Sequence, residues 1–458
     1  MLITANLIVV NAIFVRDPKI LESQTISKFQ YGRFMAKLTG SGKAYVWPEA
    51  NESGFIPIQD KGDDIFYWYF PARNSPETAP LVLWMTGGPG CSSELAIFYE
   101  NGPFSLKQTS DDQTLYHNPH AWNTNANLLY VDQPVGTGFS RAAKKGEGSD
   151  YRTDEQSIAR DMNEFLIGFL KKHPELRMRP FYITGESYAG KYVPTLGAYL
   201  DTHKNDEDNK SWINLRGVAI GNGWVKPTTQ IFGYANFAYE NKLIGETQRL
   251  SMIMQFWKCK LELKFNRTRA MGKTDCDKVT AIVGDLNSPF NEYDIRKKCS
   301  GGPLCYNFDN LTNLINNPDV IASLGIEGRK WEMCSDAPNA ALSDDEYRSA
   351  EPAVQQLVNN DYLVWVYSGD KDYACNWFGG RDWTNGMEWK HQKEYLAQKF
   401  DDCDYGSCQG FKNFRFIKVA NSGHMVPMDQ PELALQMLTE FLNTPTGRAS
   451  EEMKFESE

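Results

Sequence analysis

Residues 181–190 read FYITGESYAG, which places a serine, Ser187, shortly after an apolar run. The run FYIT is aromatic and β-branched, which is typical of a buried strand. Small residues flank the serine, with Gly185 two positions before it and Ala189 two positions after it. They allow a sharp strand-to-helix turn to pack tightly and to expose a serine hydroxyl at the end of a sheet. Taken alone, the pattern is also compatible with an ordinary turn.

Similar apolar runs recur on both sides of this segment and alternate with helical patterns. The strand-like runs are 79–85 (APLVLWM), 127–132, 215–220, 362–368 and 414–420, and helical spacing covers 152–172 and 433–442. This alternation predicts a mostly parallel sheet with helices on both faces. Residues 226–347 break the pattern and hold five of the nine cysteines, so we expect a disulfide-stapled cap there. The expected boundaries are 1–225 and 348–445 for two parts of one core, 226–347 for the cap and 446–458 for a polar tail.

An acid and a histidine complete a candidate triad with Ser187. In an α/β-hydrolase fold the serine, the acid and the histidine follow one another in the chain, each in a loop after a strand. Asp372 follows the 362–368 run and His424 follows the 414–420 run, in that order. The order predicts an α/β-hydrolase fold with this triad. Asp370 is a competing acid that the spacing does not exclude.

Acyl transfer also requires hydrogen-bond donors for the developing oxyanion. The backbone N–H of Tyr188, at the start of a helix, supplies one candidate. A second candidate lies in the turn at Gly87 and Gly88, where the lack of side chains lets the backbone approach a substrate closely. On its own, this glycine pair also reads as a simple turn.

Composition excludes several classes of function. The net charge of −10 at pH 7 argues against binding nucleic acid or an anionic membrane through bulk electrostatics. No apolar stretch of the length that spans a bilayer occurs, so we expect no membrane anchor. The six histidines are scattered and no C-x-x-C pair occurs, so we expect no metal site and no cofactor. The apolar start of the chain fits either a signal-peptide remnant or an N-terminal strand.

The cysteines and sequons favour the secretory pathway. The short spacings Cys299–Cys305 and Cys403–Cys408 fit small disulfide loops, and disulfides persist in oxidising compartments. Asn-x-Ser/Thr sequons, which are candidate glycosylation sites, occur at Asn51, Asn209, Asn266 and Asn310.

Seven segments together resemble the serine carboxypeptidases, the carboxypeptidase Y and cathepsin A family. They are WMTGGPGCSS (84–93), ENGPF (100–104), NLLYVDQPVGTGFS (127–140), GESYAGKYVP (185–194), GNG (221–223), GDKDYACNW (369–377) and GHMVPMDQP (423–431). The resemblance implies a hydrolase that releases C-terminal residues from peptides and proteins. It also implies that Asp372 rather than Asp370 is the triad acid, and that Gly88 and Tyr188 form the oxyanion hole.

The resemblance assigns a substrate-carboxylate site to Glu186, with Gly87, Thr86 and Glu100. Two carboxylates share a dry pocket only if one is protonated, so peptide binding is expected to be favoured at acidic pH. The family usually has Asn where this chain has Thr86, whose hydroxyl offers one donor instead of two. This departure keeps open an acyltransferase or esterase on the same scaffold. A non-catalytic protective partner is a further alternative, which the intact triad disfavours.

The remaining expectations also follow from the resemblance. A site for the leaving residue would be lined by Tyr99, Tyr306, Cys375 and Met425. The resemblance pairs Cys91 with Cys334 and Cys299 with Cys305, while Cys259–Cys276 and Cys403–Cys408 follow by proximity and Cys375 stays free. The expected location is a lysosome, a vacuole or the extracellular space, with a homodimer as one possible assembly.

Overall fold

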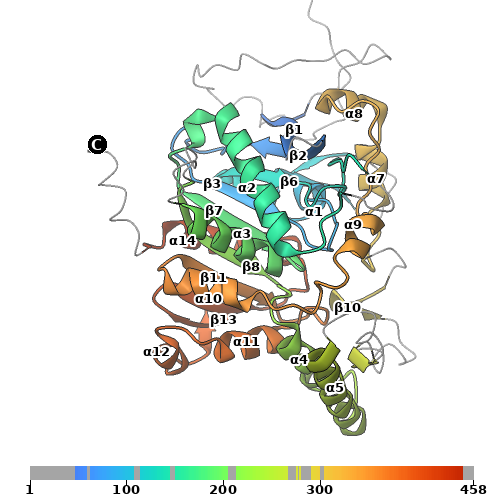
Figure 1. Cartoon of the computed structure of the whole chain (residues 1–458), viewed down its shortest axis with the longest axis vertical. Coiled ribbons are helices and arrows are strands. Elements are labelled where there is room, and N and C mark those ends of the chain that lie inside the picture. The colour runs from blue at the N-terminus through green and yellow to red at the C-terminus, as the bar shows by residue number, and fades with distance from the viewer. Residues whose placement is uncertain are drawn as a thin grey trace, which may run out of the picture.

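The computed structural model describes residues 47–58, 62–107, 114–144, 150–204, 213–266, 275–276, 278–279, 290–299 and 304–446. A ten-stranded sheet crosses the molecule in the order β1-β2-β6-β3-β7-β8-β11-β14-β13-β12 (Figure 1). Its strands are β1 (Glu52–Ile58), β2 (Asp63–Phe70), β3 (Leu81–Met85), β6 (Asn127–Val131), β7 (Phe181–Glu186), β8 (Leu215–Gly221), β11 (Leu363–Gly369), β12 (Asp401–Cys403), β13 (Gly406–Phe411) and β14 (Phe414–Val419).

The centre of the sheet is parallel and its two edges are antiparallel. Strands β6, β3, β7, β8, β11 and β14 each run parallel to their neighbours in this series. Strands β1 and β2 pair antiparallel at one edge, and β13 and β12 do so at the other. The expected mostly parallel sheet is therefore confirmed, and each predicted strand run coincides with a parallel strand. The edge strands lie outside the runs expected from the sequence.

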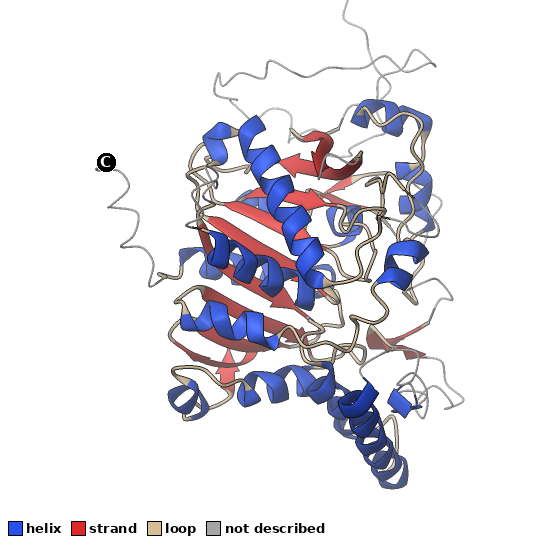
Figure 2. Ribbon diagram, viewed as in Figure 1, coloured by secondary structure: helices blue, strands red, loops and turns tan. Residues whose placement is uncertain are grey.

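Helices cover both faces of the sheet (Figure 2). One face packs against α2 (Glu155–Lys172), α3 (Ala189–His203), α10 (Glu351–Asn359) and α11 (Trp377–Gly386), and the other packs against α1 (Glu94–Tyr99), α7 (Asp309–Ile315), α8 (Pro318–Leu324), α13 (Val426–Asp429) and α14 (Pro431–Asn443). Alternating side chains of β3 pack into the hydrophobic cores on the two faces of the sheet. Leu83 points into the core on the first face, whereas Val82 and Trp84 point into the core on the second. This explains why the central strands are apolar throughout. Among the described helices, none combines the length and apolarity needed to cross a membrane.

The segment between β8 and β11, expected as an inserted cap, divides in space. Helices α4 (Pro227–Glu240) and α5 (Glu246–Asn266) form an arm that projects from one end of the sheet (Figure 1) and has its own small core. The segment also contains a hairpin of β9 (Phe290–Asn291) and β10 (Asp294–Lys298), and helix α9 (Asp336–Ala341). Helices α7 and α8 instead pack on the main sheet core. The shorter elements elsewhere are β4 (Phe104–Ser105), β5 (Tyr116–His117) and α12 (Gln392–Leu396), with the 3₁₀ turns Trp122–Thr124 and Pro174–Leu176.

The structure forms the four expected disulfides and leaves one buried free thiol. The pairs are Cys91–Cys334, Cys259–Cys276, Cys299–Cys305 and Cys403–Cys408, and the free cysteine is Cys375. The first of these ties the loop after β3 to the inserted segment across 243 residues.

The sequons differ in accessibility. Asn310 is buried and its side-chain nitrogen donates to the Lys107 carbonyl at 2.6 Å, which argues against the expected glycosylation there. Asn51 is partly exposed, and its side chain bonds to Glu49 and Trp68. Asn209 and the side chain of Asn266 lie outside the described residues.

Candidate active site

Ser187 lies at the sharp turn between β7 and α3. Its backbone φ is +68°, a left-handed conformation that a non-glycine residue adopts only when its surroundings enforce it. Three backbone hydrogen bonds do so: Ser187 N–H donates to the Gly221 carbonyl at 3.0 Å, and the Ser187 carbonyl accepts from Gly190 and Trp224, both at 2.9 Å. The turn therefore fixes the serine at the carboxyl end of the parallel strands.

The small residues around the serine are required by packing. A Cβ atom on Gly185 would lie 2.5 Å from the Met85 carbonyl oxygen and 2.8 Å from the Ala189 side chain. A Cβ atom on Gly190 would lie 2.6 Å from the Trp224 nitrogen. All three distances are too short for real contacts, which explains the residue sizes seen in the sequence.

Asp372 and His424 meet because their loops follow the adjacent parallel strands β11 and β14. Asp372 Oδ2 lies 2.8 Å from His424 Nδ1 and also accepts hydrogen bonds from Asn222 Nδ2 at 2.7 Å and from the Cys375 N–H at 3.2 Å. His424 Nε2 is buried and has no hydrogen-bond partner among the described residues. With Nδ1 engaged by the carboxylate, Nε2 is the nitrogen that remains for proton transfer.

The competing acid has a different role. Asp370 accepts a hydrogen bond from Ser422 N–H at 3.2 Å and forms an ion pair with Lys371 at 3.1 Å. It thereby joins the two loops that carry Asp372 and His424. Asn222, in the GNG segment after β8, was not singled out from the sequence, although its place at a strand end next to the triad strands is a usable signal.

The two candidate oxyanion donors belong to the loop after β3 and to the start of α3. A Cβ atom on Gly87 would lie 2.4 Å from the Tyr188 nitrogen, so only glycine lets the loop after β3 approach this helix start. Gly88 has a φ of +111°, and its loop is held by the Cys91–Cys334 disulfide. The amides of Gly88 and Tyr188 donate to no acceptor in the described part of the chain. They are therefore free to bind an anionic oxygen.

A buried pair of carboxyl groups lies beside the nucleophile. Glu186 ends β7 and Glu100 follows α1; both are at most 3% exposed, and their carboxyl groups lie near enough for each to influence the titration of the other. Burial raises the pKa of Glu100 to about 7, and burial together with the negative charge of Glu100 raises the pKa of Glu186 well above its ordinary value. The pair therefore holds at least one proton at acidic pH, which makes it a donor toward a carboxylate.

Thr86 is held in place from two sides. Its hydroxyl oxygen accepts a hydrogen bond from the indole nitrogen of Trp84 at 3.0 Å, and its N–H donates to the Ser93 hydroxyl at 3.1 Å. Within the described residues the Thr86 O–H donates to no acceptor. One hydroxyl donor thus remains at the position where the resembled family usually has an amide.

A cavity of about 330 Å³ opens at Ser187. Besides Gly88 and Tyr188 it is lined by aromatic and apolar side chains, among them Trp224, Ile231, Tyr234, Tyr347 and Tyr373, and by the polar residues Glu292, Asn339, Ser343 and Glu346. Cys375 also lines it. The other residues expected for a leaving-residue site do not: Tyr99 and Tyr306 both pack against Phe308, at ring distances of 4.7 and 5.5 Å, and Met425 is buried next to His424.

Asp372, Cys375 and His424 are the one set of three close ligand-type side chains in the described part of the chain, with ligand atoms within 4.8 Å of one another. The carboxylate and the imidazole are already hydrogen-bonded to each other. The arrangement is that of an acid and a base that act together, so we do not assign a metal to it.

The chain is similar to proteins of one family over nearly its whole length. Residues 43–444 match the family model described as serine carboxypeptidase. Serine carboxypeptidase-like 48 from Arabidopsis thaliana is 38% identical over 427 residues, covering 89% of this chain and 82% of the relative. Serine carboxypeptidase 3 from Oryza sativa subsp. japonica is 37% identical over 416 residues, covering 88% and 80% respectively.

One solved structure adds to this likeness. The crystal structure of a prohormone-processing carboxypeptidase from Saccharomyces cerevisiae superposes with a TM-score of 0.75 at 26% identity, covering 86% of this chain and 91% of that one. Together with the α/β-hydrolase sheet and the serine, aspartate and histidine gathered at its edge, these likenesses show that the chain belongs to the serine carboxypeptidase family, whose members are hydrolases acting on peptides.

Proposed function

We propose that this enzyme releases the C-terminal residue from peptides and proteins through an acyl-enzyme on Ser187, and that acidic pH favours the reaction. Ser187 Oγ attacks the scissile carbonyl carbon while His424 Nε2 takes the hydroxyl proton. Asp372, bonded to Nδ1, holds the ring in the required tautomer and stabilises the imidazolium. The amides of Gly88 and Tyr188 donate to the oxyanion.

Two further transfers complete the turnover. His424 gives its proton to the departing amine, so the C-terminal amino acid leaves and the acyl group stays on Ser187. Water then attacks the ester carbonyl, loses a proton to His424 and releases the shortened peptide as Ser187 regains its hydrogen. No cofactor takes part in this sequence.

The carboxyl pair carries the proposal of exopeptidase specificity. An enzyme that cut inside a chain would have no use for a buried proton donor beside its nucleophile. A terminal carboxylate, in contrast, can accept a hydrogen bond from the protonated Glu186–Glu100 pair, from the Thr86 hydroxyl and from the Gly87 N–H. Loss of the shared proton would place negative charge against the substrate and weaken its binding.

The cavity at Ser187 fits the residue that precedes the scissile bond. Its aromatic residues, including Tyr234 and Tyr373, favour large apolar side chains on the acyl side, and the acidic Glu292 and Glu346 line the same cavity. Tyr99, Tyr306 and Met425 would then form the site for the departing residue on the side of the carboxyl pair. Burial above all raises the pKa of Tyr306, and the negative charges of Asp429, Asp294, Asp372 and Glu186 add to the rise, which supports its placement near the last two groups.

The proposed compartment is a lysosome, a vacuole or the extracellular space. The four disulfides support an oxidising route through the secretory pathway. The protonated carboxyl pair supports an acidic destination.

The proposal is tested by comparing a blocked peptide that has a free C-terminal acid with its C-terminally amidated twin, across about pH 4.5 to 7.5. We expect release of the C-terminal residue from the free acid, most strongly at low pH, and little reaction of the amide. Equal cleavage of the two peptides would contradict carboxylate recognition.

Acyl transfer to an alcohol is a second candidate, which Thr86 favours. The single hydroxyl donor binds a terminal carboxylate less tightly than an amide would, by about 1.5–3 kcal/mol if a charge-assisted bond is lost. The triad serves either acceptor, water or alcohol, at the second step. Supplying acyl donors together with alcohols and quantifying ester product against released acid separates the two reactions.

A further inference from the structure

The β9–β10 hairpin of the inserted segment contacts the loops of both Asp372 and His424. The Tyr293 carbonyl accepts a hydrogen bond from the His424 N–H at 2.7 Å, and the Tyr293 ring packs edge-on against the imidazole with centroids 5.0 Å apart. One residue earlier, the Glu292 carbonyl accepts from the N–H groups of Tyr373 and Ala374, at 2.9 and 3.0 Å. The hairpin thus touches each of the two loops through backbone bonds.

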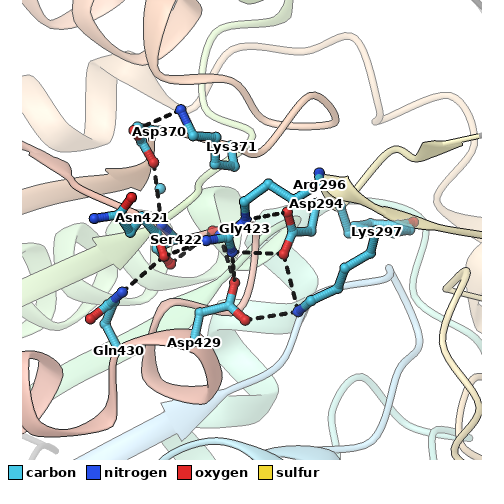
Figure 3. A network of polar contacts seen from close by, with 12 residues as sticks. Asp294, Arg296, Lys297, Asp370, Lys371, Asn421, Ser422, Gly423, Asp429 and Gln430 are labelled. Carbon is cyan, nitrogen blue, oxygen red and sulfur yellow. Dashed lines mark hydrogen bonds and ion pairs between the residues drawn. The ribbon is translucent and has the colours of Figure 1, made fainter.

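A charged network extends this contact (Figure 3). The fully buried Asp294 accepts from Arg296 at 2.8 and 2.7 Å and pairs with Lys297 at 3.0 Å. The same two cations reach Asp429, the last residue of α13: Arg296 at 3.0 Å and Lys297 at 2.9 Å. Asp429 is 9% exposed, so its charge has little access to water and depends on these partners.

Asp429 transmits the contact to the loop that carries His424. Its Oδ2 accepts a hydrogen bond from the Gly423 N–H at 2.7 Å, directly before the histidine. Arg296 also donates to the carbonyl of Asn421 in the same loop, at 2.8 Å. A Cβ atom on Gly423 would lie 2.4 Å from the Tyr293 carbonyl, so the loop is pressed against the hairpin. The backbone on the amino side of His424 is therefore fixed by charge from the inserted segment.

A purely stabilising role would explain why these ion pairs form but not why they lie beside the loop that carries His424. Exposed ion pairs contribute little to stability, and Arg296 and Lys297 are 37% and 42% exposed. The two carboxylates they join are buried, and one of them bonds to the residue adjoining His424. An error of about 1 Å in placing a catalytic group can cost about a hundredfold in rate.

We propose that Asp429, held by Arg296 and Lys297, is a positioning residue that sets the loop carrying His424, so that turnover depends on the inserted segment. Asp429 acts through Gly423 and does not touch the substrate. The inference rests on the proposed function of His424 as the base.

The test is an Asp429→Asn variant assayed at about pH 5 against a Glu432→Gln control. The asparagine keeps the size of the side chain and an acceptor for Gly423, but it loses the charge that binds both cations. Glu432 lies on the exposed start of α14, so its amide variant controls for the loss of one acidic charge. We expect kcat to fall about tenfold to a hundredfold with an unchanged KM, whereas Glu432→Gln leaves both constants unchanged.

A Lys297→Met variant removes one link from the side of the insertion and leaves Arg296 in place. This variant should lower kcat by less than Asp429→Asn does. Its control is Lys298→Met, which removes a neighbouring exposed lysine from the same strand. Equal kcat for wild type and both test variants overturns the positioning role. So does a parallel rise in KM, which would indicate a general disturbance of the site.

Labelling of Ser187 by an active-site phosphonate separates this inference from the proposed function. The phosphonate reports the reactivity of Ser187 and His424 whatever the natural substrate is. Slow labelling of Asp429→Asn beside rapid labelling of the wild type and Glu432→Gln, with similar melting temperatures, supports the positioning role. Equal labelling rates refute it, and an unlabelled wild type instead refutes the proposed nucleophile.

Discussion

Replacing the buried carboxyl pair with amides should abolish the pH dependence of substrate binding. The perturbation is Glu186→Gln with Glu100→Gln, introduced into a Ser187→Ala background so that ligand binds without being cleaved. In the starting protein, the pKa of Glu100 is raised to about 7 by burial, and the pair must keep its proton to donate to a terminal carboxylate. Amides donate without titrating, so the doubly substituted site keeps a donor at every pH.

The magnitude follows from this pKa. A terminal carboxylate titrates near pH 3.5 and is ionised throughout the range of interest. With a pKa of about 7, Glu100 holds its proton in about nine tenths of the molecules at pH 6 and in about one tenth at pH 8, and its ionised form puts a negative charge beside the substrate carboxylate. The dissociation constant of a blocked dipeptide acid should therefore rise about tenfold between these values, equivalent to about 1.4 kcal/mol.

The assay is isothermal titration calorimetry of the free-acid dipeptide and its amidated twin from pH 5.5 to 8.5. The dissociation constant of the acid should rise above pH 7 in Ser187→Ala and stay level when both glutamates are glutamine. The amidated twin should bind weakly and without pH dependence to either protein. A tenfold rise that persists in the amide-substituted protein would refute the reasoning, because another group would then control carboxylate binding.

Three further outcomes follow from the same contacts. Thr86→Asn restores a second hydrogen-bond donor, so the KM of free-acid peptides should fall about tenfold while the KM of amidated peptides stays the same. Steady-state kinetics with a free-acid peptide and its amidated twin checks this. Stability should fall as pH rises from about 5 to 8, because the folded state holds the Glu100 proton up to about pH 7, whereas the unfolded chain releases it near 4.5. That difference corresponds to about 3 kcal/mol, and it should be reduced in Glu100→Gln when melting curves are compared across pH. A mercurial should block the enzyme through Cys375, because the sulfur of Cys375 lies within 4.8 Å of the reactive atoms of Asp372 and His424. The Cys375→Ser variant should stay active when the mercurial is added. Full activity of wild-type enzyme that carries one mercurial on each Cys375 would contradict this prediction.

The parallel core was predictable because burial on both faces leaves a strong signal in the sequence. Strand β3 is wholly apolar and wholly buried, and its run ends where the glycine turn begins. Strand β2 is also fully buried, yet its sequence DDIFYWYF begins with two acids and was not recognised. Its partner β1 alternates less clearly and is only partly buried. Antiparallel edges of this kind carry weaker patterns than a central parallel strand.

The meeting of Asp372 and His424 could be predicted because it depends on chain order and strand ends. The choice between Asp372 and Asp370 could not be made from spacing, since both acids follow β11 closely. The structure separates them by geometry: one carboxylate lies 2.8 Å from His424 and the other pairs with Lys371 and Ser422. Local sequence does not encode which side of a loop faces its neighbour.

The contacts of the inserted segment were beyond reach from the sequence for a related reason. Arg296 and Lys297 read as ordinary surface charges within the hairpin. Their partner Asp429 lies 133 and 132 residues away, at the end of the short helix α13 that follows β14. Arg296 and Lys297 reach Asp429 only because the hairpin packs against that part of the chain. Neither hydrophobic periodicity nor motif spacing in the sequence indicates such packing.

A second buried carboxyl pair lies in the core that supports the proposed carboxylate site. Glu94 and Asp132 form this second pair of interacting carboxyl groups, and burial raises the pKa of both. Asp132 also accepts from the Ser93 N–H at 3.2 Å, and the Ser93 hydroxyl accepts from the Thr86 N–H at 3.1 Å. Loss of the proton shared by this second pair would put two like charges under the residue that helps bind the substrate carboxylate. The support of Thr86 therefore depends on the second pair keeping its shared proton.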